Sequence, residues 1–205
     1  YEKLVAWAKT YEVGVVSDLA YGALGYQGYE NPSFLSTPGA KDVGIEFYTF
    51  SKTFNMAGWR LAFAAGNDQM IEALNLIQDH LFVGIFPALQ EAGIAALLDP
   101  KSEEAVAQLN ATYDSRRDAF VQAAAKIGWQ AFPSRGSFYA WMPVPEGYTS
   151  ESFADLLLEK VHVAVAPGKG FGPAGDAYVR IGLLVEPERL VEAVDRIANL
   201  HLFNN

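Results

Sequence analysis

An acidic and a basic side chain each follow a predicted strand of this sequence. Asp18 comes directly after the β-branched run 13–17, and the pair Ser51-Lys52 follows the apolar run 45–50. Because ligands of open α/β sheets bind outside the carboxyl ends of the strands, we expect Asp18 and Lys52 to face the same crevice. A lysine whose pKa is lowered by burial or by neighbouring cations is a nucleophilic amine. Without its neighbours, Lys52 would be interpreted as a solvated surface lysine.

Strands and helices alternate along the part of the chain that would position these residues. The uninterrupted run 13–17 predicts a strand buried on both faces of a parallel sheet. The Gly-, Tyr-, Asn- and Pro-rich stretch 21–39 predicts a loop or short helical turns. After a long helix the pattern changes to that of a smaller α+β unit. The further predicted elements are strands at 45–50 and 60–65, helices starting at Asn67 and covering 87–98, a long helix from a Ser102 cap to 128, strands at 136–142, 161–166 and 177–183, and helices at 150–160 and 187–200.

The composition excludes several classes of protein. The chain has 15 Lys and Arg against 24 Asp and Glu, a net charge of −9, which argues against nucleic-acid or anionic-membrane partners and favours a small-molecule ligand. It has no Cys, which excludes disulfides, thiolate nucleophiles and Cys-ligated zinc and fits a reducing cytoplasm. No apolar run reaches the roughly 20 residues of a membrane helix. His80, His162 and His201 are too scattered to predict a metal site.

Three segments carry a resemblance to a known family. They are Asp18-Leu19-Ala20-Tyr21, the stretch YTFSKTFNMAGWRL at 48–61, and Tyr178-Val179-Arg180-Ile181-Gly182. Their order and separation resemble the signature of the fold-type I pyridoxal-phosphate aminotransferases of class I/II, in which a Ser-Lys pair followed by Gly-x-Arg marks the cofactor lysine. The resemblance spans essentially the whole chain. It implies an α/β fold, in which 1–110 form the carboxyl-terminal part of a three-layer α/β/α cofactor domain and 111–205 a smaller α+β domain.

The resemblance implies roles around the ring of pyridoxal 5'-phosphate. Lys52 matches the lysine that forms a Schiff base with the cofactor aldehyde and, once released, moves a proton at the substrate α-carbon. Asp18 matches the carboxylate that keeps the pyridine nitrogen protonated, which strengthens the ring as an electron sink. Tyr21 matches the phenol that hydrogen-bonds the ring oxygen. The alternatives are a helix cap for Asp18 and simple aromatic packing for Tyr21.

Further roles concern two anionic groups. Arg60, with the hydroxyls of Thr49 and Ser51, matches the positions that bind the cofactor phosphate, although hydroxyls at strand ends often serve only as turns or caps. Arg180 lies within the apolar run 177–183, where an unpaired cation is costly. A bidentate bond to the substrate α-carboxylate would explain it, and a structural ion pair at a strand edge is the alternative.

A glycine pattern in the second half is rejected as a dinucleotide site. Residues 170–175 fit G-x-G-x-x-G, but Pro173 interrupts them and a predicted strand follows where that site needs a helix. The stretch 166–172 instead resembles the family's loop near the substrate, for which a plain turn is an equal alternative. Arg135, Phe138 and Tyr139 are left unassigned.

These observations predict one function and leave two alternatives. We expect transfer of an amino group between an α-amino acid and a 2-oxo acid, in a homodimeric cytoplasmic enzyme. A pyridoxal-phosphate C–S lyase would use nearly the same residues, and a non-catalytic or regulatory remnant would keep the fold alone. Retention of Lys52 with the other matched residues favours a catalytic parent. The sequence starts within a helix-like pattern and without Met, so we expect the carboxyl-terminal half of a longer enzyme, with weak cofactor binding and no activity of its own.

Overall fold

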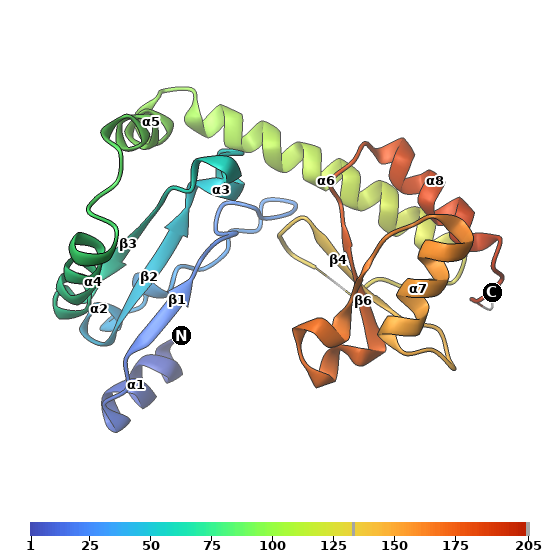
Figure 1. Cartoon of the computed structure of the whole chain (residues 1–205), viewed down its shortest axis with the longest axis horizontal. Coiled ribbons are helices and arrows are strands. Elements are labelled where there is room, and N and C mark those ends of the chain that lie inside the picture. Colours follow the sequence, from blue (N-terminus) through green and yellow to red (C-terminus); the bar gives the residue numbers. More distant parts are fainter. Residues whose placement is uncertain (133, 204–205) are drawn as a thin grey trace. The chain divides into compact units, whose positions relative to one another are not determined.

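The chain divides into two compact units. The computed structural model describes residues 1–132 and 134–203, and Figure 1 shows their helices and strands. The units are Tyr1–Leu109 and Asn110–Asn205, a division one residue from the predicted domain boundary. Whether each unit is an independent domain stays a prediction. No helix within 1–132 or 134–203 is both long and apolar enough to cross a membrane.

The first unit is built on a three-stranded sheet in the order β1-β2-β3. β1 and β2 are parallel, whereas β3 runs antiparallel to β2, as Figure 1 shows. The parallel pair, joined through a long connection, confirms the α/β class. The elements of this unit are α1 (Glu2–Tyr11), β1 (Val15–Asp18), α2 (Ala40–Val43), β2 (Gly44–Thr49), α3 (Phe50–Thr53), β3 (Ala62–Gly66), α4 (Asp68–Leu81), α5 (Pro87–Leu98) and the start of α6 (Ser102–Lys126).

The prediction that the first strand is buried on both faces is wrong. β1 includes Asp18, and its residues alternate between half-buried and exposed, with Val16 61% exposed. β1 is an edge strand with β2 as its neighbour, and among the described residues no element buries the face that carries Val16. The β-branched run therefore indicated strand propensity correctly but not two covered faces.

Two predicted helix starts have different outcomes. Asn67 caps α4 as expected, because its side-chain oxygen accepts a hydrogen bond of 3.1 Å from the Met70 amide. Ser102 does not cap α6, since its hydroxyl donates to the carbonyl of Ala96. Asp99 accepts instead, from the Lys101 amide at 2.8 Å. The turn between α5 and α6 thus places an acceptor three residues earlier than predicted.

A buried carboxylate ties β2 to β1 and to a turn within the long connection between them. Glu46 is 7% exposed, and its oxygens accept hydrogen bonds from the Ser17 hydroxyl at 2.9 Å and the Ser33 hydroxyl at 2.5 Å. A third bond, of 2.7 Å, comes from the backbone amide of Phe34, a fully buried residue. These donors compensate the desolvation of a charge that would otherwise be costly to bury.

The second unit contains the larger core. Its antiparallel sheet has the order β4-β6-β5. Trp129, 1% exposed, lies in the core and donates its indole N–H to the carbonyl of Pro143 at 2.7 Å. Thr149 and Ser152 form a capping box at the start of α7. The elements are the remainder of α6, β4 (Tyr139–Pro143), α7 (Ser150–Val161), β5 (Ala166–Pro167), β6 (Tyr178–Gly182) and α8 (Pro187–Ala198).

The predicted strand 161–166 is mostly wrong. α7 continues to Val161 and ends at His162, whose φ of 56° is left-handed, so that β5 retains only Ala166–Pro167. The valines at 161, 163 and 165 pack against the core. These valines alternate with other residues because a connecting segment buries every second side chain. The same alternation is typical of a paired strand, which explains the wrong prediction.

We predict that Glu46→Ala lowers the free energy of unfolding by about 3 kcal/mol, because three donors lose a charged acceptor. Urea unfolding followed by circular dichroism measures this loss. Glu46→Gln retains a carbonyl acceptor and is expected to cost less. The exposed Glu72→Ala in α4 is the control, and equal effects of Glu46→Ala and Glu72→Ala would contradict the structural role of Glu46.

Candidate active site

Two of the predicted segments, 18–21 and 48–61, meet at one edge of the first sheet. Asp18, the last residue of β1, pairs in register with Phe47, and Thr49 at the end of β2 pairs with Ala62 at the start of β3. Because β3 is antiparallel, its beginning lies beside the end of β2. Arg60 precedes Ala62 by two residues, so the segments that carry Arg60 and Lys52 reach the same edge as Asp18.

Hydroxyl groups shape the turn that follows β2. The Thr49 hydroxyl accepts a hydrogen bond of 3.2 Å from the Ser51 amide and lies 2.9 Å from the Ser51 hydroxyl, to which it donates. The Phe50 amide donates to the carbonyl of Leu61 at 3.2 Å, which joins this turn to the segment before β3. Ser51 is buried, and the Thr49 hydroxyl also lies 3.4 Å from the carbonyl of Leu61.

Lys52 lies on α3, the short helix directly after β2. The side chain is half-buried. A hydrogen bond of 2.7 Å between the hydroxyls of Tyr48 and Thr53 fixes α3 against the end of β2. Phe50, the first residue of α3, and Leu61 pack on α5 at Gly93. The packing is close, since a Cβ added at Gly93 would lie only 2.6 Å from Leu61 Cδ2. The position of Lys52 thus depends on contacts from β2 and α5.

Arg60 lies at a backbone position of positive φ, 55°. Its side chain is exposed and donates a hydrogen bond of 2.9 Å to the carbonyl of Ala57. No ion pair of Arg60 occurs among residues 1–132 and 134–203. The guanidinium therefore keeps donors for an anion at this edge.

Asp18 is the last residue of β1, and Tyr21 lies in the turn that follows. The exposed Asp18 carboxylate makes no hydrogen bond or ion pair with any residue that the structure describes. Tyr21 is half-buried, and its carbonyl accepts a hydrogen bond of 3.1 Å from the Asn31 side-chain amide. The same amide donates to the carbonyls of Gly22 and Leu24, at 3.2 and 3.1 Å. Asn31 thereby holds the loop that carries Tyr21.

Arg180 belongs to the second unit and lies in β6. Its guanidinium carbon is 4.1 Å from the centre of the Tyr139 ring and 4.2 Å from that of Phe171. The alternative of a structural ion pair has no support, because Arg180 reaches no carboxylate in the described ranges of the chain. The flanking Val179 and Ile181 are buried in the core.

The glycine-containing segment before β6 forms two tight turns. They are 3-10 turns, Gly168–Phe171 and Pro173–Ala177, and β6 follows, so the prediction of a strand rather than a helix after the glycine pattern is confirmed. Asp176 accepts from the hydroxyl of the fully buried Ser150 at 2.8 Å. The Glu151 carboxylate, 2.6 Å from Lys169 Nζ, raises the pKa of that exposed ammonium through a hydrogen bond and charge attraction.

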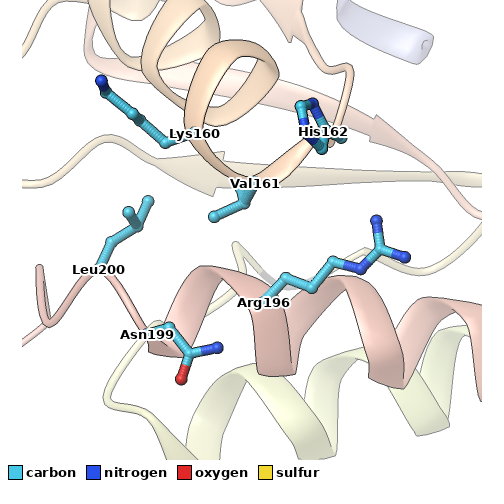
Figure 2. Close-up of a pocket in the computed structure, with 6 residues that line it drawn as sticks. All are labelled: Lys160, Val161, His162, Arg196, Asn199 and Leu200. Carbon is cyan, nitrogen blue, oxygen red and sulfur yellow. The ribbon is translucent and has the colours of Figure 1, made fainter.

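Each unit has at least one surface pocket. A pocket of about 800 Å³ over β3 is lined by Arg60 together with apolar side chains such as Phe63 and Phe86. The other, of about 440 Å³, lies at the carboxyl ends of α7 and α8, and Figure 2 shows Lys160, His162 and Arg196 around it. None of the predicted site residues lines this second pocket, which is therefore not the candidate active site.

The arrangement at the edge of the first sheet defines a class of protein. An α/β sheet presents a carboxylate, a lysine, a hydroxyl pair and an arginine at one edge, which suits an anionic cofactor bound through an amine. The family model described as aminotransferase class I and II matches residues 1–197. The chain belongs to this family.

Individual relatives agree with this assignment. The L-glutamine--4-(methylsulfanyl)-2-oxobutanoate aminotransferase of Bacillus subtilis (strain 168) is 57% identical over 203 residues, which cover 99% of this chain and 50% of that protein. The LL-diaminopimelate aminotransferase of Moorella thermoacetica is 45% identical over 197 residues, with coverage of 96% and 50%. The structure of apo-BacF from Bacillus subtilis superposes on this chain with a TM-score of 0.94 at 44% sequence identity. The match covers 100% of this chain and 52% of the BacF chain. The chain spans about half the length of the curated relatives it matches.

Sequence reasoning found the residues at the strand ends and missed those that hold them. Asp18, Tyr21, Thr49, Ser51, Lys52 and Arg60 all lie in the first unit near the end of its sheet. The missed residues are Asn31, Glu46 and Tyr48. A charged residue within the apolar run 45–50 was a signal for Glu46, whereas nothing local distinguished Asn31 from other loop residues.

We predict that Asn31→Ala speeds amide hydrogen exchange across residues 19–31, because three loop carbonyls lose their shared donor. Exchange of the intact chain followed by mass spectrometry measures the change. The expected loss of local stability is roughly 1–3 kcal/mol. Asn75→Ala, an exposed position in α4, is the matched control, and unchanged exchange in 19–31 would contradict the role of Asn31.

Proposed function

We propose that this chain forms the carboxyl-terminal half of a pyridoxal-phosphate-dependent aminotransferase, called here the full-length enzyme. In this proposal the enzyme transfers an amino group between an α-amino acid and a 2-oxo acid. The observation that carries the proposal is that Asp18, Lys52 and Arg60 come from separate segments to one sheet edge. Membership of the aminotransferase family and the half-length match to named aminotransferases support it.

The polar groups at the edge fit the cofactor. The Asp18 carboxylate has no partner among the residues described and can accept a hydrogen bond from a protonated pyridine nitrogen. In this proposal the hydroxyls of Ser51 and Thr49 and the guanidinium of Arg60 bind its phosphate, and their position beside the end of β2 supports that role. Tyr21 lies three residues after Asp18, within reach of the ring oxygen in this proposal. When bound, the cofactor supplies an electron sink for the carbon that reacts.

Lys52 carries the reactive amine of the proposal. Its amine would hold the cofactor at the aldehyde carbon. When not so engaged, the amine would act as general base and acid, taking a proton from the substrate α-carbon and returning one. α3 holds Lys52 in place through the hydrogen bond between Tyr48 and Thr53.

Arg180 is proposed to bind the α-carboxylate of the substrate. A guanidinium presents parallel N–H donors that match the two oxygens of a carboxylate. The absence of any carboxylate partner for Arg180 within 1–132 and 134–203 supports this role. The role restricts the substrate to the class of α-amino acids and their 2-oxo acids.

The names of the relatives suggest the first substrates to test. At 57% identity, the Bacillus subtilis relative named for L-glutamine and 4-(methylsulfanyl)-2-oxobutanoate is the nearer guide of the two described above. We therefore propose glutamine with a sulfur-containing 2-oxo acid as the first pair. We also propose a homodimer in the cytoplasm. Trp59, Phe63 and Phe86 are exposed in this chain. Exposed aromatic side chains of this kind support a surface that the rest of the enzyme or a second subunit covers.

We predict that Lys52→Ala in the full-length enzyme abolishes the yellow absorbance of covalently held cofactor, because the amine that binds the aldehyde is lost. Absorbance spectra of the purified variant, together with mass spectrometry after borohydride reduction, measure this. Lys41→Ala, an exposed lysine of the same unit, is expected to keep the absorbance and the reduced adduct. A reduced adduct that persists in Lys52→Ala would contradict the assignment of Lys52.

We predict that the full-length enzyme with glutamine yields a 2-oxo acid and the amine form of the cofactor in a single turnover. The amine form should return to the starting spectrum on addition of 4-(methylsulfanyl)-2-oxobutanoate. Stopped-flow spectra and product analysis measure both steps. Release of ammonia and pyruvate from a cysteine-type substrate, with no amine form, would instead identify the C–S lyase, and no spectral change with any amino acid would favour a non-catalytic protein.

A further inference from the structure

The surroundings of Arg180 differ from those of other arginines in its unit. Arg116, Arg117, Arg189 and Arg196 each contact a carboxylate. Arg180 instead lies over two aromatic rings, at 4.1 and 4.2 Å from their centres. Such distances are within the range of a cation–π interaction.

We propose that Tyr139 and Phe171 are positioning residues that hold the Arg180 guanidinium by cation–π contact and leave its N–H groups for the substrate carboxylate. The inference rests on the proposed function, in which Arg180 binds that carboxylate. A protein carboxylate in the same place would hold the cation equally well but would occupy the N–H donors and neutralise the charge. Ring faces attract the cation without accepting its hydrogen bonds in the guanidinium plane.

The position of Phe171 is fixed by the turn that carries it. At Gly168 an added Cβ would lie 2.2 Å from the carbonyl oxygen of Gly175, so the two backbone segments touch there. The Phe171 ring meets the Trp141 ring edge to face, with centres 5.8 Å apart. Asp176 closes the far end of the segment through its bonds to Ser150.

The position of Tyr139 is fixed by the sheet. Tyr139 pairs in register with Gly182, and Trp141 pairs with Arg180. Phe138 and Tyr139 also contact each other, with ring centres 4.8 Å apart. The two rings therefore come from separate, anchored segments, one from β4 and one from the turn before β6. Holding Arg180 in one rotamer before the substrate arrives reduces the entropy lost on binding.

The test compares variants of the full-length enzyme that keep or remove each ring. Phe171→Leu and Tyr139→Leu are expected to raise KM for the amino acid about tenfold with kcat unchanged, in line with a cation–π contact. Tyr139→Phe keeps the ring and is expected to keep the parent KM. Phe132→Leu, a comparably exposed phenylalanine of the same unit at 60% against 53%, is the control. Because Phe171 is exposed, its variant stays informative even if Tyr139→Leu fails to fold.

A second substrate separates carboxylate binding from a general effect on the site. This substrate is the amine that corresponds to the amino acid without its α-carboxylate. It is expected to bind the ring variants and the parent enzyme equally. Equal weakening for the amine and the amino acid would overturn the inference, as would an unchanged KM in both ring variants.

The nuclear magnetic resonance signal of the Arg180 Nε–H in the present chain gives a readout without catalysis. Phe171→Leu should shift this signal through loss of the ring current, and an unshifted signal would also overturn the inference.

Arg180→Leu distinguishes failure of this inference from failure of the proposed function. If Arg180→Leu removes the preference for the amino acid over the amine while the ring variants retain it, the rings do not position Arg180 and the proposed role of Arg180 stands. If Arg180→Leu retains that preference, the carboxylate role of Arg180 itself is wrong.

Discussion

The register of the central strand β2 brings Asp18, Lys52 and Arg60 to the same edge of the first sheet. Its register with β1 sets Asp18 opposite Phe47, and its register with β3 sets Thr49 opposite Ala62. A shift of one residue in either pairing would turn the side chains to the other face of the sheet. The buried Glu46 opposes such a shift, because its three hydrogen bonds connect β2 with Ser17 and with the turn at Ser33 and Phe34.

The parts of the site that sequence could predict are those that depend on local pattern. Asp18 and Lys52 follow runs of strand-forming residues, and Arg60 precedes one, so strand ends alone bring them to one edge. The supporting contacts join distant residues. Glu46 meets a serine 29 positions away, and Asn31 reaches carbonyls 7 to 10 positions back. Such contacts depend on the path of the whole segment between β1 and β2. That segment has no periodic sequence pattern from which its path could be predicted.

The errors in two strand predictions have a common physical cause. An apolar sequence pattern does not distinguish burial of the side chains from pairing of the backbone. The valines at 161, 163 and 165 are held by the core of the second unit while β5 pairs at only two residues. At β1 the opposite holds, since the strand pairs with β2 while Val16 stays 61% exposed. Pairing and burial are separate constraints, and each strand needs both to be specified.

Arg60 and Arg180 share a property that the composition makes informative. The chain carries 24 acidic residues against 15 basic ones, so carboxylates are plentiful, and several arginines of the second unit are paired. Neither Arg60 nor Arg180 has such a partner in the described ranges, and each is held by groups that carry no formal charge: a backbone carbonyl for Arg60, two aromatic rings for Arg180. An arginine held in this way keeps its charge for an external anion. In an acidic protein, keeping carboxylates away from these two cations is therefore a structural requirement of the proposed binding of a phosphate and a carboxylate.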